Sequence, residues 1–206
     1  MAGRRPRKAD SVSLERYHGK RRFEATPEPR GRAPRRSRSR RGGRYVVQRH
    51  RATALHYDVR LELGGVLVSW AVPRGPSLDP ARKRLAIHVE DHPLEYFDFE
   101  CVIPGAQYGA GDVIVWDWGR WTPDKSIDDA EASVRAGELK FRLDGEKLRG
   151  EFVLVRTGRR QPGAKEQWLL IHRRDGEIVR GWDAEDHPES VKTGRTNDEV
   201  AAGQRA

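Results

Sequence analysis

Residues 56–62 alternate polar and apolar side chains without a break, which limits the structures that they can form. Side chains of an extended strand point to opposite faces in turn, so one face of this segment is polar and the other is apolar. The polar members are His56, Asp58, Arg60 and Glu62, and the apolar members are Tyr57, Val59 and Leu61. The pattern predicts a strand with one face in a core. The other face is either a solvated surface or a chemical site.

Eight further segments show strand-like patterns and are separated by turn residues. The nine predicted strands are 44–50, 56–62, 66–72, 84–91, 97–102, 112–117, 138–143, 150–156 and 167–173. Gly64 and Gly65 form a two-residue hairpin signal, and residues 144–147 form a second turn. Many short strands at close spacing predict an antiparallel barrel or a sandwich.

One or two short helices are predicted beside the strands. The clearest spans residues 127–136, with Ser126 as a candidate N-cap, Asp129 at the capping-box spacing and Gly137 as the C-terminal stop. A second short helix is expected within residues 12–23.

Positive charge is concentrated at the N-terminal end. Residues 1–43 hold 15 Lys and Arg against 4 Asp and Glu, whereas residues 44–206 hold 25 against 27. We expect 1–43 to be a basic, largely flexible arm, because such a segment cannot bury enough apolar surface to fold alone. A cationic arm attracts nucleic acid, although such arms also bind membranes or acidic proteins or only increase solubility. The expected division continues with a barrel domain at 44–175 and a polar tail at 176–206, where a capped helical turn begins at Thr196.

Cys101 is the only cysteine, which excludes an internal disulfide and a cysteine-based zinc site. It has no nearby signal of activation, so we interpret it as a small buried thiol rather than a nucleophile. No apolar run has the length needed to cross a bilayer, and no hydrophobic stretch follows the arginine-rich N-terminus. We therefore expect a cytoplasmic protein with no signal peptide and no membrane partner.

Two imidazoles and one carboxylate occur close together in the sequence. His56 and Asp58 are two residues apart on one predicted strand and therefore share a face, whereas His50 joins them only if residues 51–55 turn the chain back. Two nitrogen ligands and one oxygen ligand leave coordination positions open, as catalytic metal sites require. The three residues are therefore candidate ligands for a divalent cation.

Arg60 continues the same polar face. Its planar guanidinium suits bidentate contact with phosphate oxygens better than any other side chain. The alternative is an ion pair with Glu62 or with a neighbouring strand.

A second polar row is predicted at His88, Glu90 and His92, and Pro93 ends that strand. An imidazole at a strand end can transfer a proton or bind a phosphate, because its charge changes near neutral pH. The alternative is a solvated histidine. The pairing with Glu90 favours the functional interpretation of His92.

Other aromatic and polar side chains give weaker signals. Tyr96 is a candidate for a phosphate contact or for closing a strand end. Trp116, Trp118 and Trp121 either stack on nucleic-acid bases or, as we expect, pack a hairpin onto the core. His172 alternates with apolar residues and is interpreted as structural.

These motifs together resemble the 3′-phosphoesterase domain of bacterial ligase D, an end-joining DNA repair enzyme, including free-standing versions of that domain. The matching stretches are 45–50, 55–62, 69–76, 83–86, 90–94, 103–104, 108–111, 115–117 and 168–171. They run in order through roughly residues 14 to 173. The resemblance implies a compact β-barrel with a crescent-shaped groove that binds manganese, or a similar ion such as Zn²⁺ or Co²⁺, and trims DNA 3′ ends.

In that family the enzyme removes a terminal ribonucleoside and then the remaining 3′-phosphate, which leaves a 3′-hydroxyl. The resemblance assigns the metal to His50, His56 and Asp58. It assigns contacts with the scissile phosphate to Arg60, His92 and Tyr96, and a supporting role to Glu90. The expected partners are DNA ends with a 3′-ribonucleotide or a 3′-phosphate, an end-joining ligase or polymerase, and end-binding proteins.

The family's N-terminal motif falls on residues 21–28, where Arg21 and Glu28 are expected to complete the active site. Arg22 stands where the family has Asp, a change of two charge units, so we expect the phosphomonoesterase step to be affected most. Cys101 stands where Gly is usual and Gln107 where Glu is common, and both look structural.

The residues and the resemblance favour a metal-dependent enzyme that processes DNA 3′ ends. Two other interpretations stay open. Two histidines and an aspartate on a β-barrel also suit a non-haem iron oxygenase, although Arg60 and the basic arm favour phosphate. The other interpretation is a module that binds DNA ends without catalysing a reaction, and the replacement of the family's Asp by Arg22 makes it credible.

Overall fold

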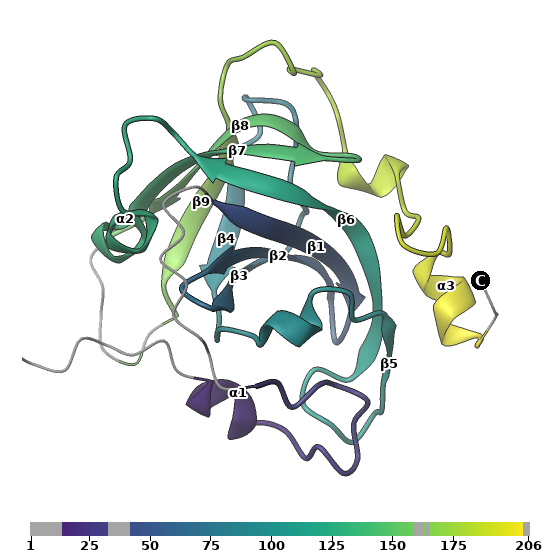
Figure 1. Cartoon of the computed structure of the whole chain (residues 1–206). Coiled ribbons are helices and arrows are strands. Elements are labelled where there is room, and N and C mark those ends of the chain that lie inside the picture. Colours follow the sequence, from purple (N-terminus) through teal and green to yellow (C-terminus); the bar gives the residue numbers. More distant parts are fainter. Residues whose placement is uncertain (1–13, 33–41, 159–162, 164, 204–206) are drawn as a thin grey trace, which may run out of the picture.

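Nine antiparallel strands form one sheet in the computed structural model, which describes residues 14–32, 42–158, 163 and 165–203. They are β1 (Gly43–Arg51), β2 (Leu55–Leu63), β3 (Val66–Val72), β4 (Arg84–His88), β5 (Cys101–Ile103), β6 (Gly111–Pro123), β7 (Glu138–Gly145), β8 (Arg149–Arg156) and β9 (Gln167–His172). The order β1-β2-β3-β4-β9-β8-β7-β6, with β6 pairing back to β1, closes eight strands into a barrel, and β5 adds to β6 (Figure 1). The predicted mostly β antiparallel barrel is confirmed.

The strand prediction fails in detail where the chain leaves β4. Strand β4 ends at His88, three residues before the predicted end, and the chain then crosses to β3, where His92 forms an isolated bridge with Leu67. The predicted strand 97–102 is reduced to β5, because a 3₁₀ helix η1 (Leu94–Tyr96) follows Pro93. These departures matter because they determine where His92 and Tyr96 lie.

The helices are short, and one begins later than expected. Helix α2 (Ala130–Ala136) is capped by Asp129, whose side chain accepts a hydrogen bond from the Ala132 amide. Ser126 instead belongs to a turn in which its amide and hydroxyl donate to Asp124 Oδ1. Gly137 ends the helix in the left-handed conformation, as predicted.

The remaining helices lie in the terminal segments. In the predicted helix 12–23 only α1 (Glu15–His18) forms, and residues 12 and 13 lie outside the described residues. A 3₁₀ helix η2 (Ala184–Asp186) precedes α3 (Asn197–Ala201). Thr196 caps α3 with a full capping box, which confirms the predicted turn.

Tryptophans fill much of the core. Trp116 and Trp121 are fully buried, as expected for packing rather than base stacking, whereas Trp118 is half-buried and stacks on Phe97. His172 is buried against Phe152, with ring centroids 4.8 Å apart. Cys101 is only half-buried, in the short strand β5.

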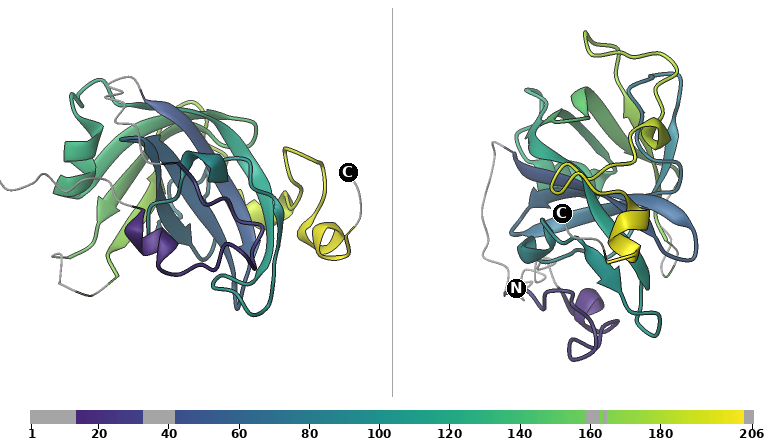
Figure 2. Two further views of the ribbon diagram at one scale, coloured as in Figure 1. Left: turned by 60° about the horizontal axis from the view of Figure 1, so that its bottom comes forward. Right: turned by 90° about the vertical axis from the view of Figure 1, so that its right-hand side faces the viewer.

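The described parts of both terminal segments pack on the barrel, on different sides (Figure 2). In residues 14–32, Tyr17 is fully buried and its hydroxyl donates to the Pro29 carbonyl. In the C-terminal segment, the buried Asn197 amide donates to the backbone carbonyls of Arg49 and Asp112. The rest of the expected arm lies outside the described residues, and the division into arm, barrel and tail stays a prediction. No helix in the described ranges is both long enough and apolar enough to span a membrane.

Candidate active site

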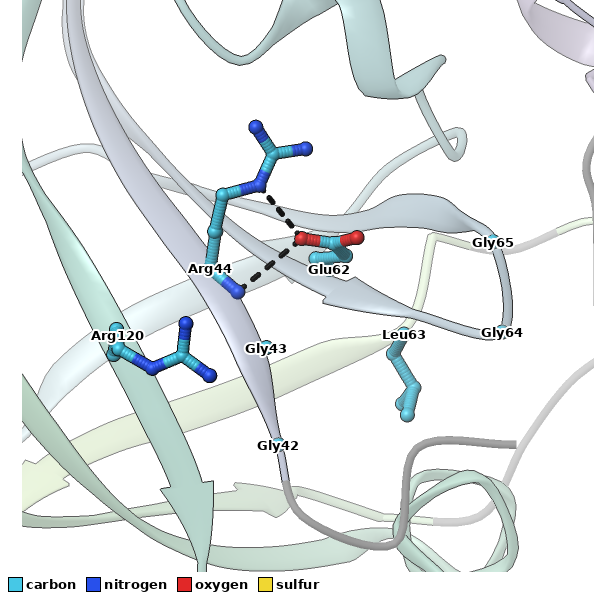
Figure 3. A pocket seen from close by; sticks show the side chains of 8 residues that line it. All are labelled: Gly42, Gly43, Arg44, Glu62, Leu63, Gly64, Gly65 and Arg120. Carbon is cyan, nitrogen blue, oxygen red and sulfur yellow. Dashed lines mark hydrogen bonds and ion pairs between the residues drawn. The ribbon is translucent and has the colours of Figure 1, made fainter. Parts of the chain in front are cut away.

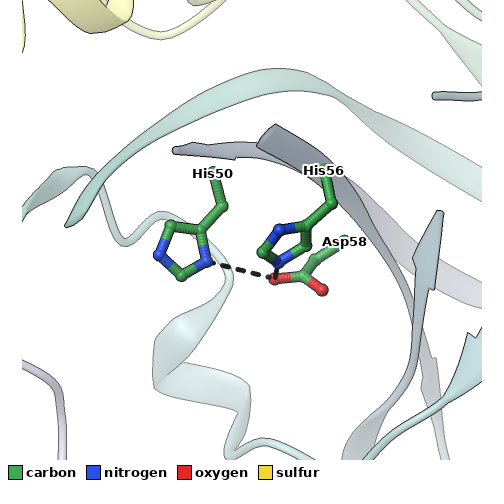
Figure 4. A group of neighbouring side chains, drawn as sticks. All are labelled: His50, His56 and Asp58. Atoms are coloured by element: carbon green, nitrogen blue, oxygen red, sulfur yellow. Dashed lines mark ion pairs between the residues drawn. The ribbon is translucent and has the colours of Figure 1, made fainter. Parts of the chain in front are cut away.

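The β1–β2 hairpin brings the three candidate metal ligands together. The ladder pairs His50 with His56 and Gln48 with Asp58, and side chains paired in this way share a face. Asp58 Oδ2 lies 3.9 Å from His50 Nδ1 and 3.8 Å from His56 Nε2 (Figure 4). All three ligand atoms lie within 4.8 Å of one another. The turn that the sequence required between the two histidines is therefore present.

Backbone carbonyls fix both imidazoles in the orientation that metal binding needs. His50 Nε2 lies 2.9 Å from the Gly109 carbonyl oxygen, and His56 Nδ1 lies 3.0 Å from that of Ala54. A carbonyl only accepts, so these nitrogens carry the hydrogens and the two nitrogens facing Asp58 present lone pairs. Metal-ligating histidines are held by the same kind of contact. The donor set of two neutral nitrogens and one carboxylate oxygen fits a divalent cation.

Asp58 is ionised although it is buried. Burial alone would raise the pKa of its carboxyl, but the charge of Arg60 holds that pKa well below its ordinary value. Arg60 Nη2 donates to Asp58 Oδ2 over 2.9 Å. The cluster therefore keeps one negative charge at neutral pH, and it can hold a metal ion.

Arg60 is more fully engaged than the sequence suggested. The residue is 2% exposed; Nε donates to Gln48 Oε1 (2.8 Å) and Nη1 donates to Ser69 Oγ (3.0 Å). Nη1 also lies 2.9 Å from His92 Nδ1. Four of the five N–H bonds of this guanidinium thus point at protein atoms. A bidentate contact with phosphate therefore requires Arg60 to give up one of these protein contacts. The alternative interpretation, an ion pair with Glu62, does not form: Arg60 pairs with Asp58, and Glu62 pairs with Arg44.

His92 lies between two guanidinium groups. Its Nδ1 is close to Arg60 Nη1, as above, and is 2.9 Å from the Glu90 carbonyl, while its Nε2 lies 3.3 Å from Arg21 Nη2. A neutral imidazole accepts only one hydrogen bond, through the nitrogen that carries no proton. The other guanidinium therefore faces the ring N–H and finds no acceptor there. Burial, and then the charges of Arg60 and Arg21, hold the pKa of His92 well below its ordinary value. The ring is therefore neutral in this structure, in a cationic pocket.

The N-terminal segment closes this pocket through paired charges. Arg21 Nε donates to Glu28 Oε1 (2.8 Å) and Nη1 donates to Glu90 Oε1 (3.4 Å). Lys20 Nζ donates to Glu90 Oε2 (2.8 Å), and the Tyr96 hydroxyl donates to Glu28 Oε1 (3.1 Å). Burial, and then the Glu28 charge, raise the pKa of Tyr96 well above its ordinary value, so its hydroxyl stays a donor. The structure thus brings together the residues that the resemblance assigned to the metal and to the phosphate, with Arg21, Glu28 and Glu90 beside them.

Comparison with known proteins agrees with this geometry. A family model described as the DNA ligase D 3′-phosphoesterase domain matches residues 48–156, more than half of the chain. The chain belongs to this family.

Curated relatives of this phosphoesterase-family chain are much longer proteins. A multifunctional non-homologous end joining protein LigD of Pseudomonas aeruginosa is 54% identical over 192 residues, which is 90% of this chain and 22% of the relative. A multifunctional non-homologous end joining DNA repair protein LigD of Mycobacterium tuberculosis is 47% identical over 116 residues, 56% of this chain and 15% of the relative. The chain thus spans less than a quarter of the length of these relatives.

Arg22 is where this chain departs from the phosphoesterase-family motif, and its side chain points to solvent. It lies in the turn after Arg21, where its carbonyl accepts a hydrogen bond from the Ala25 amide. Within the described residues no ion pair or hydrogen bond involves its guanidinium. The added charge therefore lies at the protein surface, next in the chain to Arg21.

His88 does not share a face with Glu90 and His92, contrary to the sequence prediction. It stacks on Trp70, with ring centroids 5.2 Å apart, and Trp70 faces away from its neighbour Ser69. The reason is that β4 ends at His88, so alternation does not continue into the residues that follow.

Several residues of the site were missed in the sequence. Gln48 and Ser69 contact Arg60 from neighbouring strands, and alternation from His50 would have placed Gln48 on the polar face. Lys20 and Tyr108, which share a 3.0 Å hydrogen bond, come from segments without a strand pattern and gave no such signal.

Proposed function

We propose that this protein is a divalent-metal-dependent phosphoesterase that acts on DNA 3′ ends during non-homologous end joining. It removes 3′-terminal ribonucleosides and 3′-phosphates and leaves a 3′-hydroxyl. One observation carries the proposal: Asp58 of the metal-ligand cluster is hydrogen-bonded to Arg60, which contacts the buried His92 between two guanidinium groups. A cation site that adjoins two guanidinium groups suits a phosphate group, and membership of the 3′-phosphoesterase family supports this assignment.

The metal ligands in this proposal are His50, His56 and Asp58. Mn²⁺ is the proposed ion because the resemblance to the ligase D phosphoesterases implies it, and the mixed nitrogen and oxygen donor set also accepts Zn²⁺ or Co²⁺. A bound divalent ion supplies Lewis-acid stabilisation of the phosphoryl oxygens. The ligand side chains contribute one negative charge, so the occupied site keeps about one net positive charge toward the substrate.

Arg60 and Arg21 hold the phosphate in this proposal. Arg60 approaches His92 at Nδ1 and Arg21 approaches it at Nε2, and one neutral ring accepts a hydrogen bond from only one of them. A phosphate oxygen that enters between them accepts the hydrogen bond that His92 cannot. The salt bridges from Arg21 to Glu28 and Glu90 keep that guanidinium in place.

In this proposal His92 transfers a proton to the leaving oxygen. It is neutral without substrate, because burial and two cations oppose its protonation. A phosphate bound beside it adds negative charge, which favours the imidazolium form and raises its pKa. The ring then has a proton to give to the leaving oxygen. The Tyr96 ring packs against His92, with ring centroids 4.8 Å apart, and supports the position of the imidazole.

The test uses the full chain with Mn²⁺ and a primer–template duplex whose primer ends in one ribonucleotide or in a 3′-phosphate. The expected products are a primer shortened by one nucleoside and a primer with a free 3′-hydroxyl. The His50→Ala variant controls for contaminating nucleases. If the folded, metal-bound protein leaves both primers unchanged, the proposal is wrong.

A second candidate function is supported by Arg22, which places a cation where the family has a carboxylate. In this candidate the protein binds DNA ends and recruits an end-joining ligase or polymerase without chemistry of its own. Salt-sensitive binding to duplex ends without metal-dependent turnover would favour it.

A further inference from the structure

The face of the hairpin that carries the metal ligands continues to a second pair of charges. On β1, Arg44 precedes His50 by six residues, and on β2, Glu62 follows His56 by six, so all four side chains lie on one face. Six residues of strand span about 20 Å. The β1–β6 ladder pairs Arg44 with Arg120, which places two guanidinium-bearing residues side by side at the far end of this face.

These residues surround a pocket of about 290 Å³ (Figure 3). Its lining residues are Gly42, Gly43, Arg44, Glu62, Leu63, Gly64, Gly65 and Arg120. Figure 3 shows the Arg120 side chain turned toward Gly43 and the outer nitrogens of Arg44 pointing away from Glu62. The volume of the pocket is sufficient for a sugar with its phosphate.

Contacts on one side of the Arg44 guanidinium hold this side chain in place. Its Nε donates to Glu62 Oε2 (2.9 Å), and its guanidinium lies 4.5 Å from the centre of the Phe97 ring. Phe97 in turn stacks on Trp118, with an interplanar angle of 6°. This stacking fixes the plane of the guanidinium and leaves its two terminal nitrogens available to a ligand.

Arg120 lacks the partner that other arginines of this region have. Arg49 and Arg51 on β1 pair with Glu185 and Asp112, respectively. Arg120 is exposed, and across the described ranges no hydrogen bond or ion pair involves its guanidinium. Like charges directly opposite on a ladder repel each other, and Glu62 neutralises only one of the two. On the other side of β6, Asp144 of β7 lies directly opposite Arg120, without an ion pair to it in the described ranges. The residues that line the pocket themselves carry one net positive charge, which an anion would balance.

We infer that Arg44 and Arg120 bind a backbone phosphate of the DNA duplex, upstream of the 3′ end that is processed. The inference rests on the proposed function. A separation of about 20 Å corresponds to about six base pairs at the rise of duplex DNA. A phosphate contact carries no sequence information, so this subsite holds the duplex in register while the terminal nucleoside lies at the metal cluster.

The test compares wild type, Arg44→Gln, Arg120→Gln and the double variant on two DNA hairpins that end in a 3′-ribonucleotide. One hairpin has a stem of four base pairs and the other has a stem of twelve. For the double variant we expect the KM and the dissociation constant of the long stem to rise about ten-fold, with those of the short stem as in wild type. The slope of the logarithm of the long-stem binding constant against the logarithm of salt concentration should become shallower, by the amount that corresponds to about one phosphate contact.

Arg180→Gln is the matched control, because Arg180 is an exposed arginine outside the pocket. Fluorescence anisotropy measures binding without turnover, so the inference is tested even if the protein proves catalytically silent. If the double variant binds the long stem as tightly as wild type, or loses affinity equally for both stems, the inference is overturned. Turnover by wild type then decides the proposed function separately.

Discussion

Asp58 presents one oxygen, Oδ2, both to Arg60 and to the two histidines. Arg60 Nη2 donates to this oxygen over 2.9 Å, and the two imidazole nitrogens that face it lie 3.8 and 3.9 Å away. The residue that orients the carboxylate therefore also belongs to the phosphate pocket. In the proposed function this shared oxygen would couple metal binding to substrate binding, and the roles of the individual residues can be separated by experiment.

Removal of a ligand should abolish metal binding without unfolding the barrel. We expect His56→Ala and Asp58→Asn to lower the affinity for Mn²⁺ by at least about 100-fold, since loss of a supporting contact alone costs 10- to 100-fold. Isothermal titration calorimetry measures this without any substrate. His187→Ala, which removes an exposed histidine, should bind as wild type does. Unchanged affinity in both ligand variants would rule out the proposed centre.

Replacement of His92 should separate chemistry from metal binding. His92 lies outside the ligand cluster but between Arg60 and Arg21. We expect His92→Asn to lower kcat by about 10²- to 10⁴-fold, as for loss of a general acid, with Mn²⁺ affinity within a few-fold of wild type. A variant that loses both properties together would assign His92 a structural role.

Arg22→Asp should restore the carboxylate that the family resemblance places next to Arg21. We expect this variant to release phosphate from a 3′-phosphate primer faster than wild type, relative to its removal of a terminal ribonucleoside. The ratio of the two rates is the measurement, because it cancels differences in folded fraction. Arg30→Asp, another exposed arginine of the same segment, makes the same charge change and should leave the ratio unaltered.

Asp91 should make stability depend on pH. Burial raises the pKa of its carboxyl to about 7, and Glu90 adds to this against the opposing charge of Arg16. The folded state therefore binds the proton more tightly than the unfolded state, so this stabilisation is complete below about pH 4 and is lost as the pH rises through 7.

Asp91→Asn removes this pH dependence. Relative to wild type, its free energy of unfolding should rise between pH 4 and pH 8 by up to about 4 kcal/mol. Urea denaturation at both pH values measures the difference. An equal difference at the two values would show that the carboxyl is not buried as described.

The strands and the metal cluster were predictable because both depend on local alternation. His56 and Asp58 share a face in any extended chain, and His50 needs only a hairpin turn to face them. The pocket around His92 was harder to predict from the sequence. His92 reaches it through a bridge to Leu67 after the end of β4, and Arg21 comes from a segment with no strand pattern. Such long-range placements depend on tertiary packing and leave no periodic signal.

The direct pairing of His50 with His56 limits how this chain can change in length. Insertion of one residue within β1 or β2 would turn every side chain beyond it to the opposite face, so a ligand would point into the hydrophobic interior. The hairpin loop at residues 52–54 and the turn at Gly64 and Gly65 lie outside the paired stretch. Length variation in homologues, and insertions made by protein engineers, should therefore be confined to these loops, while the spacing within both strands stays constant.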